Sequence, residues 1–149
     1  MKKILLFALI LSSIFTFAAE KRLLNVDKNG FAIQGYDPVA YFTDGRPVKG
    51  DSKFVSEFNG AKYQFASAAH KALFDKEPAK YEPTFGGFCA YGASQNHKAP
   101  IQPEAWQIRG GRLILNYDLD VRDTFNKDPE GYLRKAESNW PGLVEKYGK

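Results

Sequence analysis

An internal repeat constrains the fold of this chain more than any other feature of its sequence. The segment Gly60–Tyr81, "GAKYQFASAAHKALFDKEPAKY", resembles the segment Gly111–Tyr132, "GRLILNYDLDVRDTFNKDPEGY". A glycine, a phenylalanine, a proline and a tyrosine recur at a constant offset of 51 positions. Self-similarity at a fixed offset is typical of duplicated supersecondary units. The repeat therefore indicates an ancient duplication within one small domain.

Each copy has the pattern of a β-hairpin followed by a helix. The pairs Asn59-Gly60 and Gly110-Gly111 are strong signals for hairpin turns. Ser67 and Asp118, again 51 positions apart, are typical N-caps of the following helices. We therefore predict an α+β fold, a small single domain built from two hairpin-plus-helix repeats at residues 54–76 and 106–125.

Prolines and glycines set the expected ends of the elements. Pro78 and Pro129 end the first helix of each copy or bend the chain there, because proline lacks a backbone N–H. The pattern predicts a last helix over residues 130–140, stopped at Trp140-Pro141. Between the copies, residues 82–104 contain too many glycines and prolines for one long element, so we predict a joint there.

The N-terminus has the pattern of a secretory signal peptide. Lys2 and Lys3 precede the apolar run at residues 4–17, and small residues follow it. The run is shorter than the roughly 20 residues that a membrane span needs. We therefore expect residues 1–18 to be the signal peptide and residues 19–149 the mature domain. This predicts a periplasmic or secreted protein without a stable membrane anchor after cleavage.

The charge balance argues against nucleic acid as a partner. Removal of Lys2 and Lys3 with the signal peptide leaves 19 basic and 17 acidic side chains, and no basic cluster stands out. The sequence also carries no phosphate-binding loop and no dinucleotide fingerprint. We assign no catalytic residue, and the pattern favours a protein that is not an enzyme.

The single cysteine, Cys89, lies in the joint, in the stretch "PTFGGFCAYG". An odd thiol in an exported protein indicates intermolecular pairing, a reactive thiol or a metal ligand, whereas a buried inert cysteine is the alternative. Because Gly86, Gly87 and Gly92 carry no side chains to cover the loop, we predict that the sulfur is reachable at the rim of an aromatic pocket.

Four stretches together resemble the YHS-domain proteins: "GYDPVAYF", "FNGAKYQFASAAHKALFDKEPAKY", "GGFCAYG" and "LILNY". The resemblance is greatest to the exported, single-domain branch with a Gly-Gly-aromatic-Cys-Ala motif. It implies a small α+β fold of the YHS/TRASH type and a link to heavy metals, often copper. It also implies a redox role for the position of Cys89.

The chain departs from the metal-associated modules of that family, whose motifs read approximately Asp-Pro-Val-Cys and Phe-Cys-Ser-x-x-Cys. Here Ala40, Ala66 and His70 stand at the positions of the three cysteines. His70 is the one replacement that can bind a metal ion. The resemblance therefore does not by itself carry heavy-metal binding over to this chain.

Cys89 and His70 are the predicted metal ligands. A thiolate and an imidazole suit copper, as Cu(I). Alternatively, the imidazole lowers the pKa of the thiol for redox chemistry with a partner protein. Either role requires the two donor atoms to lie within about 4 Å of each other. The alternative for His70 is a packed, hydrogen-bonded histidine, and His97 is expected in a solvated loop.

A second function class, a non-catalytic binding module, stays open. Aromatic residues of the chain either line a pocket for a small ligand or a protein partner, or fill the core. The predicted pocket residues are Tyr36, Asp37, Tyr41, Phe65, Ser67, Phe88 and Tyr91.

Overall fold

The structure, a computed structural model, describes residues 20–149. The predicted signal peptide therefore lies outside the described residues. Within them the chain is α+β, with two small antiparallel sheets and several helices, as the sequence predicts. In this part of the chain, no helix combines the length and the apolar character that crossing a membrane requires.

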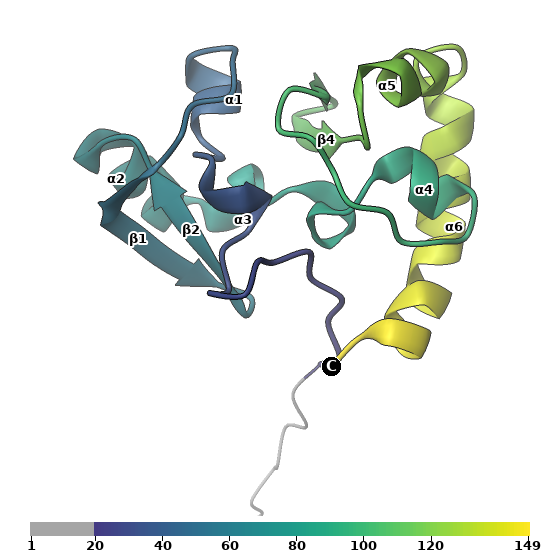
Figure 1. Ribbon diagram of the computed structural model, residues 1–149, viewed down its shortest axis with the longest axis horizontal. Helices are drawn as coiled ribbons and strands as arrows, with labels where there is room; N and C mark the ends of the chain where they lie inside the picture. The colour runs from purple at the N-terminus through teal and green to yellow at the C-terminus, as the bar shows by residue number, and fades with distance from the viewer. Residues whose placement is uncertain (1–19) are drawn as a thin grey trace, which may run out of the picture.

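The same order of elements occurs twice along the chain (Figure 1). The first half contains the 3₁₀ turn η1 (Ile33–Gly35), α1 (Ala40–Thr43), β1 (Asp51–Phe58), β2 (Ala61–Phe65), α2 (Ala68–Lys76) and α3 (Pro78–Tyr81). The second half contains η2 (Thr84–Gly87), α4 (Ala90–Ser94), β3 (Trp106–Arg109), β4 (Arg112–Leu115), α5 (Leu119–Phe125) and α6 (Pro129–Tyr147). The first half forms the left side of the view and the second half the right side.

Both predicted hairpins are present. β1 pairs with β2 around Asn59 and Gly60, whose φ angles are 52° and 88°. β3 pairs with β4 around Gly110 and Gly111, at 54° and 72°. Two successive positive φ angles are the requirement of a type I′ turn, which glycine and asparagine meet at the lowest cost. The turn residues thus fix the register of both hairpins.

Both predicted helix caps are also confirmed. The Ser67 hydroxyl accepts the backbone N–H of His70 at 3.1 Å, and the Asp118 carboxylate accepts that of Val121 at 2.8 Å. The first helix of each copy ends before the repeated proline, which then occupies the first turn of the next helix. Proline is well placed there, because its missing N–H would have no helical partner.

The predicted end of the last helix is wrong. α6 continues through Pro141 to Tyr147 instead of stopping at Trp140. Proline removes one helical hydrogen bond and leaves the carbonyl of Glu137 to solvent, since Glu137 is exposed. Beyond the proline, Leu143 is buried in the hydrophobic core. Burial of such a side chain contributes about 2 kcal/mol, which offsets much of the cost of the proline.

The predicted joint between the copies is, from Thr84 onward, part of the second copy. Residues 33–35 have φ angles of 51°, 53° and 78°, and residues 85–87 repeat them at 51°, 57° and 80°. A short helix follows each turn. The duplication therefore covers almost the whole described chain, and it makes Asp37 and Cys89, 52 positions apart, equivalent residues.

Strand β4 lies between two hydrophobic cores. Leu113 and Leu115 pack in the first core, with Tyr63, Phe65 and Phe74. Ile114 packs in the second core, whose members include Phe85, Phe125, Leu133 and Leu143. Ile114 alternates with Leu113 and Leu115 and shares the strand face of Arg112, yet it is fully buried. A strand covered on both faces loses the usual alternation of apolar and polar residues.

Residues 23–25, which precede the first half, lie against the glycine-rich loop at residues 85–87. The backbone N–H of Asn25 donates to the carbonyl of Gly86 at 2.8 Å. A Cβ atom at Gly86 would lie only 1.9 Å from the carbonyl oxygen of Leu23. Gly86 thus permits a close backbone approach, and the backbone that approaches is the chain's own.

This contact predicts a difference between two glycine substitutions with similar backbone angles. Gly110 has a φ of 54° and open space around it, whereas Gly86 has a φ of 57° and the Leu23 backbone in contact. We expect Gly110→Ala to lower the free energy of unfolding by about 1 kcal/mol, through backbone strain alone. Gly86→Ala should cost clearly more, because residues 23–25 must also move away. Urea unfolding measures both, and equal losses would contradict the close contact.

Candidate functional site

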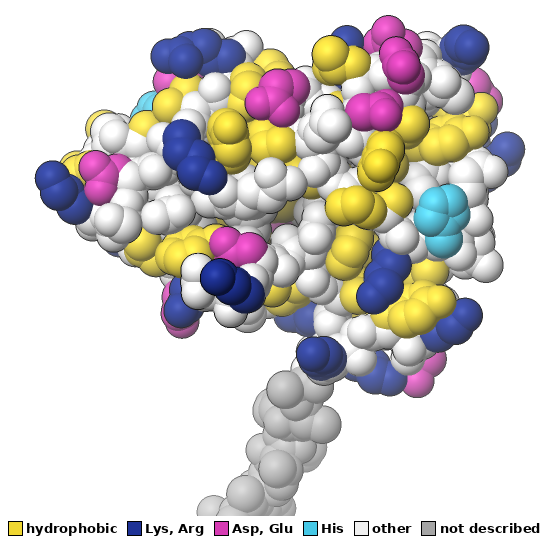
Figure 2. Space-filling view, in the orientation of Figure 1, with side chains coloured by type: hydrophobic (Ala, Val, Ile, Leu, Met, Phe, Trp, Pro, Cys, Tyr) yellow, Lys and Arg dark blue, Asp and Glu magenta, His cyan; other side chains and the backbone are white. Residues whose placement is uncertain are grey.

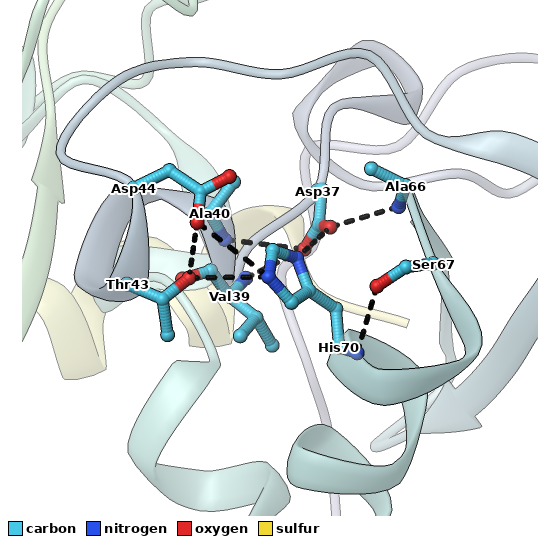
Figure 3. Close-up of polar contacts among 8 residues, drawn as sticks. All are labelled: Asp37, Val39, Ala40, Thr43, Asp44, Ala66, Ser67 and His70. Carbon is cyan, nitrogen blue, oxygen red and sulfur yellow. Dashed lines mark hydrogen bonds and ion pairs between the residues drawn. The ribbon is translucent and has the colours of Figure 1, made fainter.

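A fully buried carboxylate, that of Asp37, organises the first half of the chain (Figure 3). Its Oδ1 atom accepts the backbone N–H groups of Val39 at 2.8 Å and Ala40 at 3.3 Å. Its Oδ2 atom accepts the N–H of Ala66 at 2.8 Å and contacts Nδ1 of His70 at 2.6 Å. The carboxylate thereby ties the start of α1 to the end of β2 and to α2.

His70 is held so that one ring nitrogen faces the protein and the other faces the surface. A carboxylate only accepts hydrogen bonds, so Nδ1 carries the proton that is shared with Asp37. The lone pair of a neutral ring is then on Nε2, which lies 3.2 Å from Oγ1 of Thr43 and 3.6 Å from Oδ1 of Asp44. The His70 side chain is 15% exposed and that of Asp44 34%. Figure 3 shows both residues beside Thr43.

The second half shows that the fold does not require this arrangement. Cys89 stands where Asp37 stands, and the apolar Val121 occupies the position of His70. The backbone pattern is nevertheless retained: the N–H of Asp37 donates to Val48, and the N–H of Cys89 donates to Ala99. Because the second half forms the same elements without a charged pair, the Asp37–His70 pair is a feature of the first half alone.

Cys89 is buried, which contradicts the prediction that its sulfur is reachable. The side chain is 1% exposed, and Sγ accepts the backbone N–H of Gly92 at 3.3 Å. Its thiol lies 3.6 Å from Oδ1 of Asn116. Burial raises the pKa of the thiol, although the neighbouring N–H of Gly92 opposes the shift. Leu23 packs over Gly86, and Ala99 packs against Gly92, so the glycines admit other parts of this chain rather than a ligand.

Residues 39–84 match the family model of the YHS domain. The chain contains a YHS domain. The matched range includes His70, Thr43 and Asp44 and covers most of the first half. The YHS domain is a family associated with metal handling. Neither a curated protein nor a solved structure gave a match.

The two predicted metal ligands have separate surroundings. In the YHS domain His70 contacts Asp37, Thr43 and Asp44, whereas Cys89 contacts Gly92 and Asn116 in the second half. None of these contacts joins the imidazole to the thiol. Between residues 20 and 149, no three histidine, cysteine, aspartate or glutamate side chains lie close enough together to hold a metal ion.

The predicted pocket residues are spread over several environments. Tyr41 and Phe65 are buried in the first core, and the Tyr41 hydroxyl donates to the carbonyl of Pro103. Tyr36 packs beneath the ammonium of Lys49, and Tyr91 packs edge-on against Tyr132. Two further members, Asp37 and Ser67, belong to the polar site around His70. Phe88 lines a surface hollow near the chain ends.

Sequence reasoning missed Thr43 and Asp44. Thr43 ends α1 and Asp44 follows it, just before Gly45, in a stretch that reads as an ordinary turn. Nothing in the sequence marks their approach to His70, which lies 26 positions beyond Asp44. His97, by contrast, lies exposed in the loop where it is predicted.

The burial of Cys89 predicts the behaviour of its thiol. A soluble aromatic disulfide reagent should label Cys89 only after the protein is denatured, because the folded chain excludes the reagent and disfavours the thiolate. Rapid labelling of the folded protein would contradict the buried position.

The raised pKa also has a consequence for stability. An unfolded cysteine has a pKa of about 8.5, and the folded value is higher. The unfolded chain therefore releases this proton first as the pH rises, and stability falls between about pH 8.5 and the folded pKa. We expect the stability advantage of the native protein over Cys89→Ser to shrink as the pH rises from 7 to 9.5. A constant difference in urea unfolding would exclude this coupling.

Proposed function

We propose that this chain is an exported metal-handling accessory protein and that its metal ion binds at His70 rather than at Cys89. The observation that carries the proposal is the orientation of the imidazole. Asp37 holds the proton on Nδ1, and Nε2 faces a carboxylate and a hydroxyl at the surface. Histidines that bind metals commonly donate their other N–H to a carboxylate, which fixes the ring and makes it a better ligand.

The spacing of the donor atoms fits a metal ion. Two adjacent ligand atoms that each lie about 2.1 Å from a square-planar ion, the geometry typical of Cu(II), are about 3.0 Å apart. Nε2 of His70 and Oδ1 of Asp44 are 3.6 Å apart, and Thr43 Oγ1 lies 2.8 Å from the same carboxylate. The two donor atoms therefore have to approach each other by about 0.6 Å to share one ion.

The donor set favours copper in its divalent state. Imidazole nitrogen and carboxylate oxygen suit Cu(II), whereas Cu(I) prefers thiolate or thioether ligands. A buried thiol does not favour the predicted Cu(I) site at Cys89, nor a thiol redox role with a partner protein. His70 and Asp44 leave positions around the ion open for water or for ligands from another protein. That arrangement suits an ion that is passed on as cargo better than one that is held permanently.

The test is Cu(II) binding by the mature protein, followed by calorimetry and by electron paramagnetic resonance. We expect one site with nitrogen hyperfine coupling. His70→Gln should weaken the binding at least about tenfold, and Asp44→Asn should weaken it less. The loss follows from removal of the nitrogen ligand, while the N-cap at Ser67 does not depend on the imidazole.

Two variants serve as matched controls. His97→Gln removes the other histidine, which is exposed in a loop, and Cys89→Ser removes the thiol. Both should bind Cu(II) as the native protein does. Unchanged binding by His70→Gln would refute the site, and loss of binding by Cys89→Ser with a folded protein would restore the thiol as the ligand.

A further inference from the structure

A surface hollow of about 900 Å³ lies between the start of the described chain and its end. Residues 20–27 form one side, and the end of α6 with Lys149 forms another. The turn at Asn59-Gly60 and the side chain of Phe88 complete it. The hollow shares no lining residue with the site around His70. Its volume is within the range of about 300–1,000 Å³ that is typical of small-molecule sites.

Part of the lining of the hollow is apolar. Its hydrophobic lining consists of Leu23, Leu24, Val26, Phe88 and Tyr147. Val26 and Tyr147 are also among the exposed large hydrophobic residues of the described chain. Figure 2 shows hydrophobic side chains running down this face toward the chain ends, with lysine and arginine side chains beside them. A patch of this kind favours an apolar ligand body.

Three basic side chains also line the hollow. The lining includes Arg22, Lys98 and Lys149. The ammonium of Lys98 lies over the ring of Tyr147, 4.8 Å from its centre, and no carboxylate of residues 20–149 pairs with it.

The two acidic residues of the lining already have partners. The carboxylate of Glu20 lies 3.5 Å from the guanidinium of Arg22. Oδ1 of Asp27 accepts the backbone N–H groups of Asn29 and Phe31. Neither Lys98 nor Lys149 pairs with a carboxylate within residues 20–149, so their ammonium groups are available to an anion.

We infer that this hollow binds an amphipathic anion, a long-chain monocarboxylate such as a fatty acid. The alkyl chain lies along Leu24, Val26 and Phe88, and the carboxylate meets Lys98 at the rim. Apolar area then supplies most of the affinity, while the cation selects the sign of the head group. The inference does not depend on metal binding at His70.

Calorimetric titration of the metal-free mature protein with dodecanoate, below its micelle concentration, tests the inference. We expect one molecule bound per chain. Dodecanol and dodecyltrimethylammonium carry the same alkyl chain with a neutral and a cationic head, and they should bind several-fold more weakly. Lys98→Glu should weaken dodecanoate binding by about three- to tenfold. Val26→Asp, at an exposed position, should weaken it at least as much because it places a charge beside the alkyl chain.

Lys53→Glu, an exposed charge reversal on β1 outside the hollow, is the matched control and should leave dodecanoate binding unchanged. Circular dichroism checks that each variant is folded. Absence of dodecanoate binding would overturn the inference. So would equal binding of the three head groups, or binding that neither Lys98→Glu nor Val26→Asp alters.

Discussion

The buried carboxylate of Asp37 is the interaction on which the first half of the molecule depends. A charge without access to water is costly unless hydrogen bonds replace the water that it loses. Four groups do so here: the N–H groups of Val39, Ala40 and Ala66, and the ring of His70. These groups come from α1, from the end of β2 and from α2, so satisfying one carboxylate also fixes three elements. The orientation of the imidazole is a consequence of the same requirement.

The duplication provides an internal comparison for this interaction. In the second half, Cys89 is the N-cap of α4 and its sulfur accepts the N–H of Gly92, three positions on, just as the Asp37 carboxylate accepts the N–H of Ala40. A neutral thiol needs no charged partner, so the apolar Val121 can stand where His70 stands in the first half. In the second half, this position therefore holds a neutral cap within the core. In the first half it holds a carboxylate paired with an imidazole, whose second nitrogen faces the surface.

The same comparison explains why a single thiol lies among glycines. A side chain at Gly86 would collide with the backbone of Leu23. At Gly92, a side chain would be in tight contact with Ala99 and with the carbonyl of His97. The glycines of this loop thus serve close packing within the chain. Leu23, which lies against Gly86, also lines the hollow near the chain ends, so one segment both covers the glycine-rich loop and forms part of the hollow.

The sequence by itself determined the elements whose causes are local. Both hairpin turns need only residues that adopt positive φ angles, and the caps at Ser67 and Asp118 need only a side chain and an N–H three positions on. The repeat, the YHS resemblance and the α+β class follow from such patterns.

Other features could not be predicted from the sequence, because they depend on contacts between residues far apart in the chain. Burial of Leu143 in the second core stabilises the part of α6 beyond Pro141. Strand β4 packs against a core on each face, and the backbone of Leu23 lies against Gly86. The sequence also points to Asp37 and His70 as site residues. Their contact, and the position of Asp44 beside His70, cannot be predicted from their spacing along the chain, because both arise only when the end of α1 lies beside α2.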